Sequence, residues 1–437
     1  TPSNDYPATI AATWGISFKA VRKQSRAASD LLYLCAFLAP DNIRLDMFHK
    51  GAEYVPTSLR DATSDSLKLD KIIGTLHSYS LVEANEDGSA ISIHRLVQAV
   101  LRDRLSTKNK GTWIEATLQM VNRSFSYDQS DITTWPVAGV VLPHALMISS
   151  FPELSEVPTG EIAKVLSILL NQVAAYLLST AQYAAARVQA QRALAIGEAV
   201  YGPNHLYVAV YLSNLGDVLR GLGDLSGART YYERALAITD ATYGSDHPHV
   251  AINLSKLGDV LKELGDLQEA RSNSERALAI GEAVYGPDHP DMATLLGNLG
   301  AILKELGDLQ GAHSYLERAL AIGEAVYGPD HPFVATWLNN LGLILQDLGD
   351  LPGARAYLER ALAISEAVYG PDHPALARRF GNLGNVLVLQ GHLKEGRSYL
   401  KRAYTMFLQY LGPKHHYTTI TRKLMEAANL LHDEEDE

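Results

Sequence analysis

The sequence predicts a mainly α-helical protein in which an N-terminal domain with a small β-hairpin and a helical linker precede a long α-solenoid. A segment that begins with Tyr-Gly recurs every 42 residues, at Tyr201, Tyr243, Tyr285, Tyr327 and Tyr369. Within each copy, apolar residues recur three and four positions apart, which places them on one face of a helix. No 42-residue period is visible before residue 158. The chain therefore divides into a non-repeating and a repeating part.

The composition is that of an ordinary folded protein. Apolar residues make up 47% and charged residues 20% of the 437 residues, so we expect neither a membrane-spanning segment nor wholesale disorder. The net charge of −11 argues against nucleic acid as the main partner. The single cysteine, Cys35, excludes an intrachain disulfide and favours a cytoplasmic location. The chain starts with neither Met nor a signal sequence, and we expect a fragment.

Residues 28–106 are predicted to form a small domain in which helices accompany one β-hairpin. Apolar residues at helical spacing mark the helices, and turn residues between two short apolar runs mark the hairpin. The predicted elements are helices over 28–38, 66–79 and 94–105, and strands over 81–84 and 90–93. Helices followed by a hairpin and a further helix suggest a winged-helix arrangement. We assign residues 1–27 to a connector and residues 107–159 to a helical linker.

Each 42-residue copy is predicted to form a pair of helices. In the fourth copy, Leu296, Leu299 and Leu303 mark the first helix. Leu306-Gly307-Asp308-Leu309 then supplies a glycine for a left-handed helix end and an aspartate to cap the second helix. Gly328-Pro329 ends that helix. Because a pair of this size cannot bury its apolar stripe alone, neighbouring pairs must stack around a continuous core.

The array is assigned to residues 160–431. Its units are 160–201, 202–243, 244–285, 286–327, 328–369 and 370–411, followed by a half unit over 412–431. Residues 432–437 form an acidic tail that we expect to be disordered.

The spacing of small and apolar residues in each copy resembles that of the tetratricopeptide repeat. In the fourth copy these residues are Leu296, Leu299, Gly300, Leu303, Ala312, Leu316 and Ala319. The 42-residue period and the Tyr-Gly-Pro-Asp-His-Pro segment between units are most similar to the kinesin-light-chain type. This resemblance implies a right-handed solenoid whose first helices line a concave groove that binds a protein or peptide. Gly300 stands where helices approach closely, so Gly300→Leu should be strongly destabilising.

Positions on the first helices that differ between copies are candidates for ligand contacts. Their spacing of three and four places them on one face. Asparagine amides can pair with a peptide backbone, and basic side chains add positive charge. The alternative is a solvated face that is free to vary, since second-helix positions vary too. The predicted groove residues are Ser213, Asn214, Asp217, Arg220, Lys256, Asp259, Lys262, Asn298, Lys304, Thr336, Asn339, Asn340, Arg378, Asn382 and Asn385.

Five ordered motifs occur in residues 6–150: Trp14-x-Ile16-Ser17-Phe18, Ala36-Phe37-Leu38-Ala39-Pro40-Asp41, Tyr79-Ser80-Leu81-Val82, Ile93-His94-Arg95-Leu96-Val97-Gln98, and Trp135-Pro136 with Leu142-Pro143-His144-Ala145. Together they resemble the region just downstream of the nucleotide-binding domain in STAND-class signalling ATPases of the NB-ARC–tetratricopeptide type. The resemblance implies a missing nucleotide-binding domain, with ADP or ATP bound in an NTPase parent. The sequence contains no Gly-x-x-x-x-Gly-Lys-Ser/Thr phosphate loop, so we expect no cofactor and no enzymatic activity in this chain.

His94 is the most specific single candidate for a nucleotide-sensing residue. Its context is similar to the Met-His-Asp motif of related nucleotide-binding receptors, which implies that His94 reaches the phosphates of ADP bound to the missing domain. An imidazole N–H can donate to a phosphate oxygen. The sequence departs from the motif, with Ile93 for Met and Arg95 for Asp. The alternative is a structural residue at the junction of hairpin and helix.

Two other kinds of site are weighed and set aside. The histidines between units are interpreted as turn residues rather than metal ligands, because each belongs to a different unit. Helix 66–79 carries Lys68 and Lys71 but also Asp70, a thin basic face for DNA.

We therefore hypothesise the regulatory and ligand-sensing portion of a STAND signalling ATPase, with the repeats binding a protein or peptide trigger. The first alternative is a free-standing adaptor for peptide or protein cargo. The second is a winged-helix DNA-binding regulator.

Overall fold

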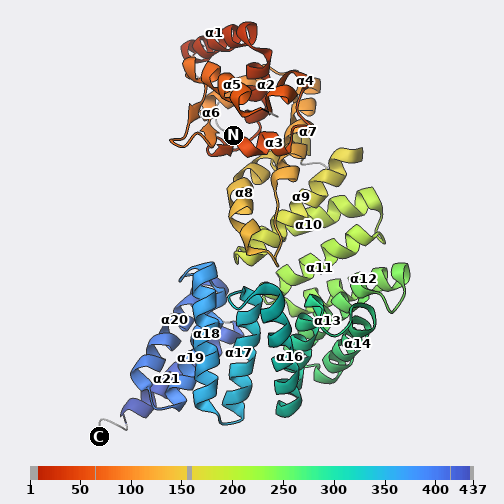
Figure 1. Cartoon of the computed structure of the whole chain (residues 1–437), viewed down its shortest axis with the longest axis vertical. Coiled ribbons are helices and arrows are strands. Elements are labelled where there is room, and N and C mark those ends of the chain that lie inside the picture. Colours follow the sequence, from red (N-terminus) through yellow and green to blue (C-terminus); the bar gives the residue numbers. More distant parts are fainter. Residues whose placement is uncertain (1–7, 64, 155–159, 414, 434–437) are drawn as a thin grey trace. The chain divides into compact units, whose positions relative to one another are not determined.

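The computed structural model describes residues 8–63, 65–154, 160–413 and 415–433 (Figure 1). Of the described residues, 79% are helical, and the predicted mainly α class is confirmed. Contacts divide it into two compact units. Unit 1 comprises Thr1–Tyr176 with Gln189–Pro203, and unit 2 comprises Leu177–Val188 with Asn204–Glu437. The acidic tail lies outside the described residues from position 434 onward.

Unit 1 contains short helices and a small sheet. Its elements are α1 (Ala8–Gln24), α2 (Arg26–Cys35), β1 (Ile43–Arg44), α3 (Leu45–Lys50), α4 (Thr57–Thr63), α5 (Ser66–Ser78), β2 (Glu83–Ala84), β3 (Ala90–Ser92), α6 (Arg95–Asp103), α7 (Thr107–Ser124), η1 (Ile132–Thr134), α8 (Trp135–Ser149) and η2 (Pro152–Leu154). Side-chain caps start several helices. The hydroxyl of Ser25 accepts from the N–H of Ala28 at α2, and the carboxylate of Asp65 accepts from the first turn of α5. Such caps satisfy N–H groups that lack a partner within the helix.

The sheet of unit 1 is antiparallel, with strand order β1-β3-β2. The predicted hairpin forms β2 and β3, with Glu83 opposite Ser92. The additional strand β1 pairs Ile43 with Ile91. Asn42, just before β1, has a φ of +54°, which asparagine tolerates better than most residues. The predicted helices 28–38, 66–79 and 94–105 all form but end up to three residues earlier than predicted.

The core of unit 1 surrounds α2. Cys35 is fully buried, and burial raises the pKa of its thiol to about 12. The side-chain amide of Gln98, on α6, donates to the carbonyls of Cys35 and Leu38 at 2.8 and 3.0 Å. These carbonyls lie at the end of α2, where a helix leaves acceptors without partners. A buried polar side chain therefore joins α6 to α2.

Two segments correct the expectation that nothing is long and apolar enough to cross a membrane. By length and composition, Ile132–Ser149 and Gly160–Ser179 both qualify, with 33% and 50% of their residues buried in the structure. In α8, His144 is fully buried and its Nε2 lies 3.2 Å from the carbonyl of Asn42. That face of α8 packs inside unit 1, as core helices of globular proteins also do.

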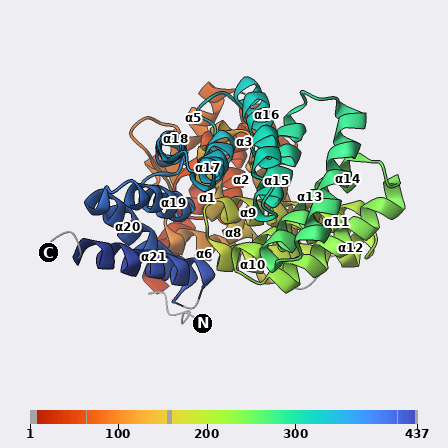
Figure 2. The same cartoon turned by 90° about the horizontal axis from the view of Figure 1, so that it is seen from below.

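The repeats form paired helices that alternate along the chain. After α9 (Gly160–Ser179) and α10 (Tyr183–Tyr201), the first helices are α11 (Leu206–Gly221), α13 (Pro248–Leu264), α15 (Pro290–Glu305), α17 (Pro332–Asp347), α19 (Ala375–Leu389) and α21 (His416–Asp433). The second helices are α12 (Leu225–Tyr243), α14 (Leu267–Tyr285), α16 (Leu309–Tyr327), α18 (Leu351–Tyr369) and α20 (Leu393–Leu411). First helices also contact the first helices of adjacent repeats, from α13 to α21. Figure 2 shows α13, α15 and α17 on the inner side of unit 2 and α14, α16 and α18 on the outer side.

Small residues set the distance between paired helices. A Cβ placed on Gly300 would lie 2.9 Å from the Cγ of Leu316 and 3.2 Å from the carbonyl oxygen of Ala312. Real Cβ atoms are rarely so close to neighbouring atoms, so α15 and α16 can pack this closely only with glycine at position 300. Between helices of a pair, Gly307 has a φ of +84°, the left-handed conformation that the sequence predicts for it.

Candidate functional site

One pocket of the repeats is lined by residues of α11, α12 and α13 and of the turn before α11. It encloses about 540 Å³, within the size range of ligand sites. It is lined by His205, Leu206, Tyr207, Ala209, Val210, Ser213, Asn214, Thr239, Tyr243, His249, Ile252, Asn253 and Lys256. We call it the groove pocket.

The groove pocket has apolar side chains at its rim and polar ones at its base. Tyr207 and Val210 are each 47% exposed and Ile252 is 38% exposed. Ser213 and Asn253 are buried, and the amide of Asn253 donates to the hydroxyl of Thr239 at 3.2 Å. Exposed apolar groups beside anchored hydrogen-bonding groups suit a peptide, which offers both side chains and backbone amides.

Several predicted groove residues next to this pocket pair with one another across repeats. The ammonium of Lys256 lies 2.6 Å from the carboxylate of Asp217, which also accepts from the Tyr232 hydroxyl at 2.7 Å. Arg220 lies 3.2 Å from Asp259. Burial acts to lower the pKa of Arg220, but the nearby carboxylates, Asp259 foremost, outweigh it and raise that pKa. These partly buried charges stabilise the contact between α11 and α13.

The same pattern continues along the remaining first helices. Asn298 donates to the Ser255 hydroxyl at 2.9 Å, and Lys304 lies 3.0 Å from a carboxylate oxygen of Asp347. Further pairs are Lys262 with Asp259 at 3.7 Å, Asn382 donating to Asn339 at 2.9 Å, Asn339 donating to Asn340 at 3.4 Å, and Asn385 donating to Gln346 at 3.3 Å. Most of these bonds join residues 39 or 43 apart in sequence, so they connect equivalent faces of successive first helices.

The structure thus places all fifteen predicted groove residues on first helices, but it does not gather them into one site. The groove pocket includes Ser213, Asn214 and Lys256. Ser213 and Asn339 are buried, at 6% and 2% exposure. The predicted groove residues do not include the aromatic and aliphatic side chains at the rim of the groove pocket. The sequence could have indicated Tyr207 and Val210, because both occupy variable positions on the same face of the first helix.

His94 is an exposed capping residue of α6. Its Nδ1 accepts from the backbone N–H of Leu96 at 3.2 Å, and its ring centroid lies 5.6 Å from that of Trp14. Arg95, also exposed, lines a second pocket of about 650 Å³ together with Asp41, Asn42 and residues of α8. The cap holds the His94 ring beside Trp14 at the surface of unit 1.

The histidines between repeats perform the same capping task. The Nδ1 atoms of His205, His247, His289 and His331 each accept from the backbone N–H two residues later, at 3.1 to 3.2 Å. The cap requires an unprotonated Nδ1. Among the described residues, no group of three or more His, Cys, Asp or Glu side chains is placed to hold a metal ion.

Comparison with known proteins gives two family matches. The tetratricopeptide repeat pattern matches residues 165–241, 222–280, 249–325, 314–351 and 333–409. A domain of unknown function, DUF7779, matches residues 19–110. A nucleotide-binding leucine-rich repeat (NLR)-like protein of Hyaloscypha variabilis is 29% identical over 201 residues, which are 45% of this chain. The chain spans 18% of the length of that relative.

Solved structures with similarity to the chain include BtubC from P. vanneervenii and a putative kinesin light chain of Podosopora anserina. BtubC is 24% identical, with a TM-score of 0.40, covering 56% of this chain and 93% of BtubC. The putative kinesin light chain has nearly identical tetratricopeptide-like repeats. It is 22% identical with a TM-score of 0.37, covering 47% of this chain and 96% of its own.

Proposed function

Because the chain belongs to the tetratricopeptide repeat family, we propose that its array binds a protein or peptide trigger along the first helices, as the sensing portion of a STAND signalling ATPase. The observation that carries this proposal is the groove pocket, where an exposed apolar rim surrounds anchored polar groups. An apolar side chain of the trigger would enter between Val210 and Ile252. Its backbone would meet the amide of Asn214.

The ion pairs beside the groove pocket support this assignment. Asp217 and Lys256 neutralise each other at 2.6 Å, so this part of the groove carries little net charge to select a strongly charged ligand. Apolar contact would therefore supply most of the affinity here, at roughly 25 cal/mol per Å² of buried apolar surface. A partner for this pocket should present an aliphatic or aromatic residue.

We propose that residues of unit 1 form a winged-helix domain that restrains a nucleotide-binding domain. The order α2, β1, α3 to α5, β2 and β3, with β3 central in the sheet, supports this. The NLR-like relative supports a STAND parent. In that parent, exposed His94 would contact the phosphates of ADP, using its Nε2 because Nδ1 caps α6. Trigger binding favours the open state only if the trigger binds that state more tightly.

Site-specific photocrosslinking tests the groove assignment. Benzoylphenylalanine replaces Val210 or Ile252 at the rim of the groove pocket, and as matched controls Val284 or Val326, which are 49% and 44% exposed on second helices. We expect crosslinks to a partner from both rim positions, and loss of the crosslink at position 252 in a Val210→Arg background. Equal crosslinking from the control positions would contradict binding along the first helices.

The role of His94 needs a protein that contains both a nucleotide-binding domain and this chain. His94→Asn preserves a side-chain acceptor for the α6 cap while removing the imidazole N–H. We expect faster loss of bound ADP from this variant, measured by fluorescent nucleotide exchange. Unchanged ADP retention would leave His94 with the capping role alone.

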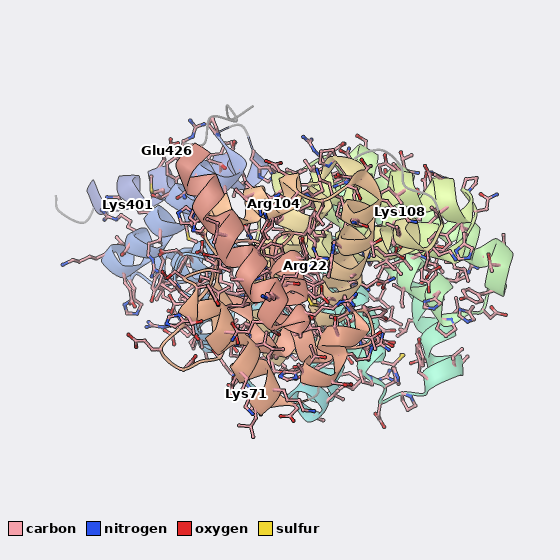
Figure 3. All side chains as sticks on the ribbon, turned by 90° about the horizontal axis from the view of Figure 1, so that it is seen from above. Arg22, Lys71, Arg104, Lys108, Lys401 and Glu426 are labelled. Carbon is pink, nitrogen blue, oxygen red and sulfur yellow. The ribbon has the colours of Figure 1, made fainter. Side chains whose placement is uncertain are left out.

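Two other functions stay as alternatives. A free-standing adaptor would bind cargo in the same groove without any nucleotide-dependent step. A DNA-binding regulator would use α5, where Lys71 projects into solvent (Figure 3). Lys68, however, pairs with Asp65 at 3.7 Å. Salt-sensitive duplex binding at low ionic strength would favour the DNA alternative.

A further inference from the structure

Two histidines late in the array contact turns near its beginning, and all four residues concerned belong to unit 2. The Nε2 of His373, in the loop before α19, lies 3.0 Å from the carbonyl of Ser179 at the end of α9, although the two residues are 194 positions apart. A Cβ placed on Gly223, in the turn between α11 and α12, would lie 3.4 Å from the Nε2 of His415, in the loop before α21. Residues far apart along the array therefore meet.

The two contacts repeat with the period of the sequence. His415 stands 42 residues after His373, and Gly223 stands 42 residues after Ala181, in the turn that follows Ser179. Because paired helices run antiparallel, turns within repeats lie along one edge of the solenoid and loops between repeats along the other. The contacts therefore join opposite edges after one full turn of the solenoid, which takes between four and five repeats.

Both histidines use one ring nitrogen within their own repeat and present the other to the contact. Nδ1 of His373 accepts from the N–H of Ala375 at 3.1 Å, and Nδ1 of His415 accepts from the N–H of Tyr417 at 3.3 Å. A neutral imidazole whose Nδ1 accepts carries its proton on Nε2. His373 therefore donates to the carbonyl of Ser179.

The turn that receives His373 has a conformation that its sequence disfavours. Ala181 has a φ of +57°, whereas the equivalent residue of each later turn is a glycine with φ between +81° and +90°. The left-handed conformation costs free energy for alanine but not for glycine. Such a residue persists where the surrounding contacts fix it. The bond from His373 supplies one such contact from outside the repeat.

Charged side chains connect these contacts to the groove. Burial raises the pKa of Tyr183, at the start of α10, and the guanidinium groups of Arg378 and Arg220 both lie close enough to act against it. Burial lowers the pKa of His415, and the nearby carboxylate of Glu263 acts to raise it. Glu263 also lies 3.5 Å from Arg220. The ion pairs between α11 and α13 thus extend to both contacts.

We propose that the contacts of His373 with Ser179 and of His415 with Gly223 form a latch that closes one turn of the solenoid around the groove and restricts access to it. The first helices α13, α15 and α17 lie on the inner side of unit 2 (Figure 2), so the joined edges surround them. One hydrogen bond contributes little net stability, and the repeats are held separately by their stacking. The latch can therefore open while the helix pairs stay folded, and the open form admits bulky partners. Only the nature of those partners depends on the proposed function.

Spin labels on either side of the latch test whether it joins the two edges. They are attached to the full chain through Ala185→Cys and Asp372→Cys, at exposed positions, while Cys35 is fully buried and stays unlabelled. We expect one short distance between the labels, and a shift to longer distances when His373→Asn is added. Asparagine keeps an acceptor for the α19 cap but is too short to reach Ser179.

His289→Asn is the matched control. Nδ1 of His289 caps α15 in the same way, 3.2 Å from the N–H of Asp291, and its other contacts among the described residues are with Tyr285 and Asp291. This variant should leave the distance between the labels unchanged. An unchanged distance in a folded His373→Asn variant, or equal lengthening by both variants, would overturn the latch.

Access to the groove is measured with maleimides of two sizes. Ile252→Cys places a thiol at the rim of the groove pocket, and its rate with a maleimide carrying a long polyethylene glycol chain is divided by its rate with N-ethylmaleimide. We expect His373→Asn to raise this ratio several-fold. Val284→Cys, at an exposed position of second helix α14, is the control, and its ratio should not change.

The maleimide rates also separate the latch from the proposed function. A ratio at Ile252→Cys that His373→Asn leaves unchanged would overturn the restriction of access, and so would an equal rise at Val284→Cys. Rim crosslinks to a partner together with an unrestricted groove would leave the proposed function intact without the latch. A latch that controls the maleimide rates without any rim crosslinks would stand, and the proposed function would be contradicted.

Discussion

The repeat array and the N-terminal unit reach a buried core by different routes. In the array, helix pairs pack mainly on their neighbours in sequence, so contacts such as that of Gly300 with Leu316 stay within one repeat or the next. The bond between His373 and Ser179 is an exception. In unit 1, the core depends on contacts between distant segments, such as Gln98 with Cys35 and Ile91 with Ile43. The packing of a repeating sequence can therefore be predicted from the residues that recur in each repeat. The packing of a small mixed domain is harder to predict, because it depends on contacts between residues far apart along the chain.

The largest test of this comparison is Gly300→Leu in the array. The added side chain would collide with Leu316 and with the backbone at Ala312. We expect a loss of about 3 kcal/mol in the free energy of unfolding, measured by chemical denaturation with circular dichroism. A matched Gly307→Leu variant removes the left-handed glycine between helices instead, where a Cβ meets nothing within 4 Å. Gly300→Leu should be the more damaging, and the reverse order would contradict close packing at Gly300.

The next largest effect is expected for Gln98→Leu in unit 1. The substitution leaves the carbonyls of Cys35 and Leu38 buried without this donor, at a cost of about 2 kcal/mol. Gln268→Leu, at an exposed position of α14 in the array, serves as the control and should have little effect. If the two variants lose the same stability in thermal unfolding, Gln98 does not join α6 to α2 as the structure indicates.

These two variants also show where sequence reasoning succeeds and where it stops. The 42-residue period predicted both helices of the fourth copy, the turn at Gly307 and the close approach at Gly300, because one pattern repeated five times defines each position. Strand β1 was missed, since two residues whose pairing partners lie 48 and 46 positions away carry no local signal. Helix α1 was likewise assigned to a connector.

The candidate site follows the same division. Helix periodicity predicted which variable positions share one face of the first helices, and the structure places those residues on the first helices. It did not predict that Lys256 would pair with Asp217, or that the buried Nε of Arg379 would have no hydrogen-bond partner in the part of the chain that the structure describes. Whether a basic side chain has a partner depends on the offset between successive first helices, which brings residues 39 and 43 positions apart into contact. It also depends on which side chain occupies each of those positions.

A smaller effect of opposite sign is expected for Gly74→Ala in α5. Position 74 is helical and exposed, and a Cβ there would meet nothing within 4 Å. Alanine should raise the free energy of unfolding of unit 1 by about 1 kcal/mol, because it loses less backbone entropy than glycine in a helix. A destabilised variant would show that α5 is more crowded at position 74 than the structure indicates. Gly74 and Gly300 would then no longer differ in the space available for a side chain.

The smallest predicted effect is a shared pH dependence, because each unit contains a histidine whose neutral form is favoured by burial. Burial lowers the pKa of His144 in unit 1 and of His373 in unit 2, against the opposing effects of the carbonyls of Asn42 and Ser179. Below about pH 6.5 the unfolded chain binds protons that the folded chain does not. Stability should therefore be greatest above that pH and fall as the pH drops toward the lowered folded values.

The His373 contribution can be separated by substitution. His373→Asn keeps an acceptor for the N–H of Ala375 but cannot titrate, so its stability should fall less steeply between pH 7.5 and 5.5 than that of the wild type. The slope is measured by thermal unfolding at each pH. A variant slope equal to that of the wild type would mean that His373 binds protons alike in the folded and unfolded chain. The pH dependence would then belong to the other histidines whose pKa burial lowers, which are His144 in unit 1 and His249 and His415 in unit 2.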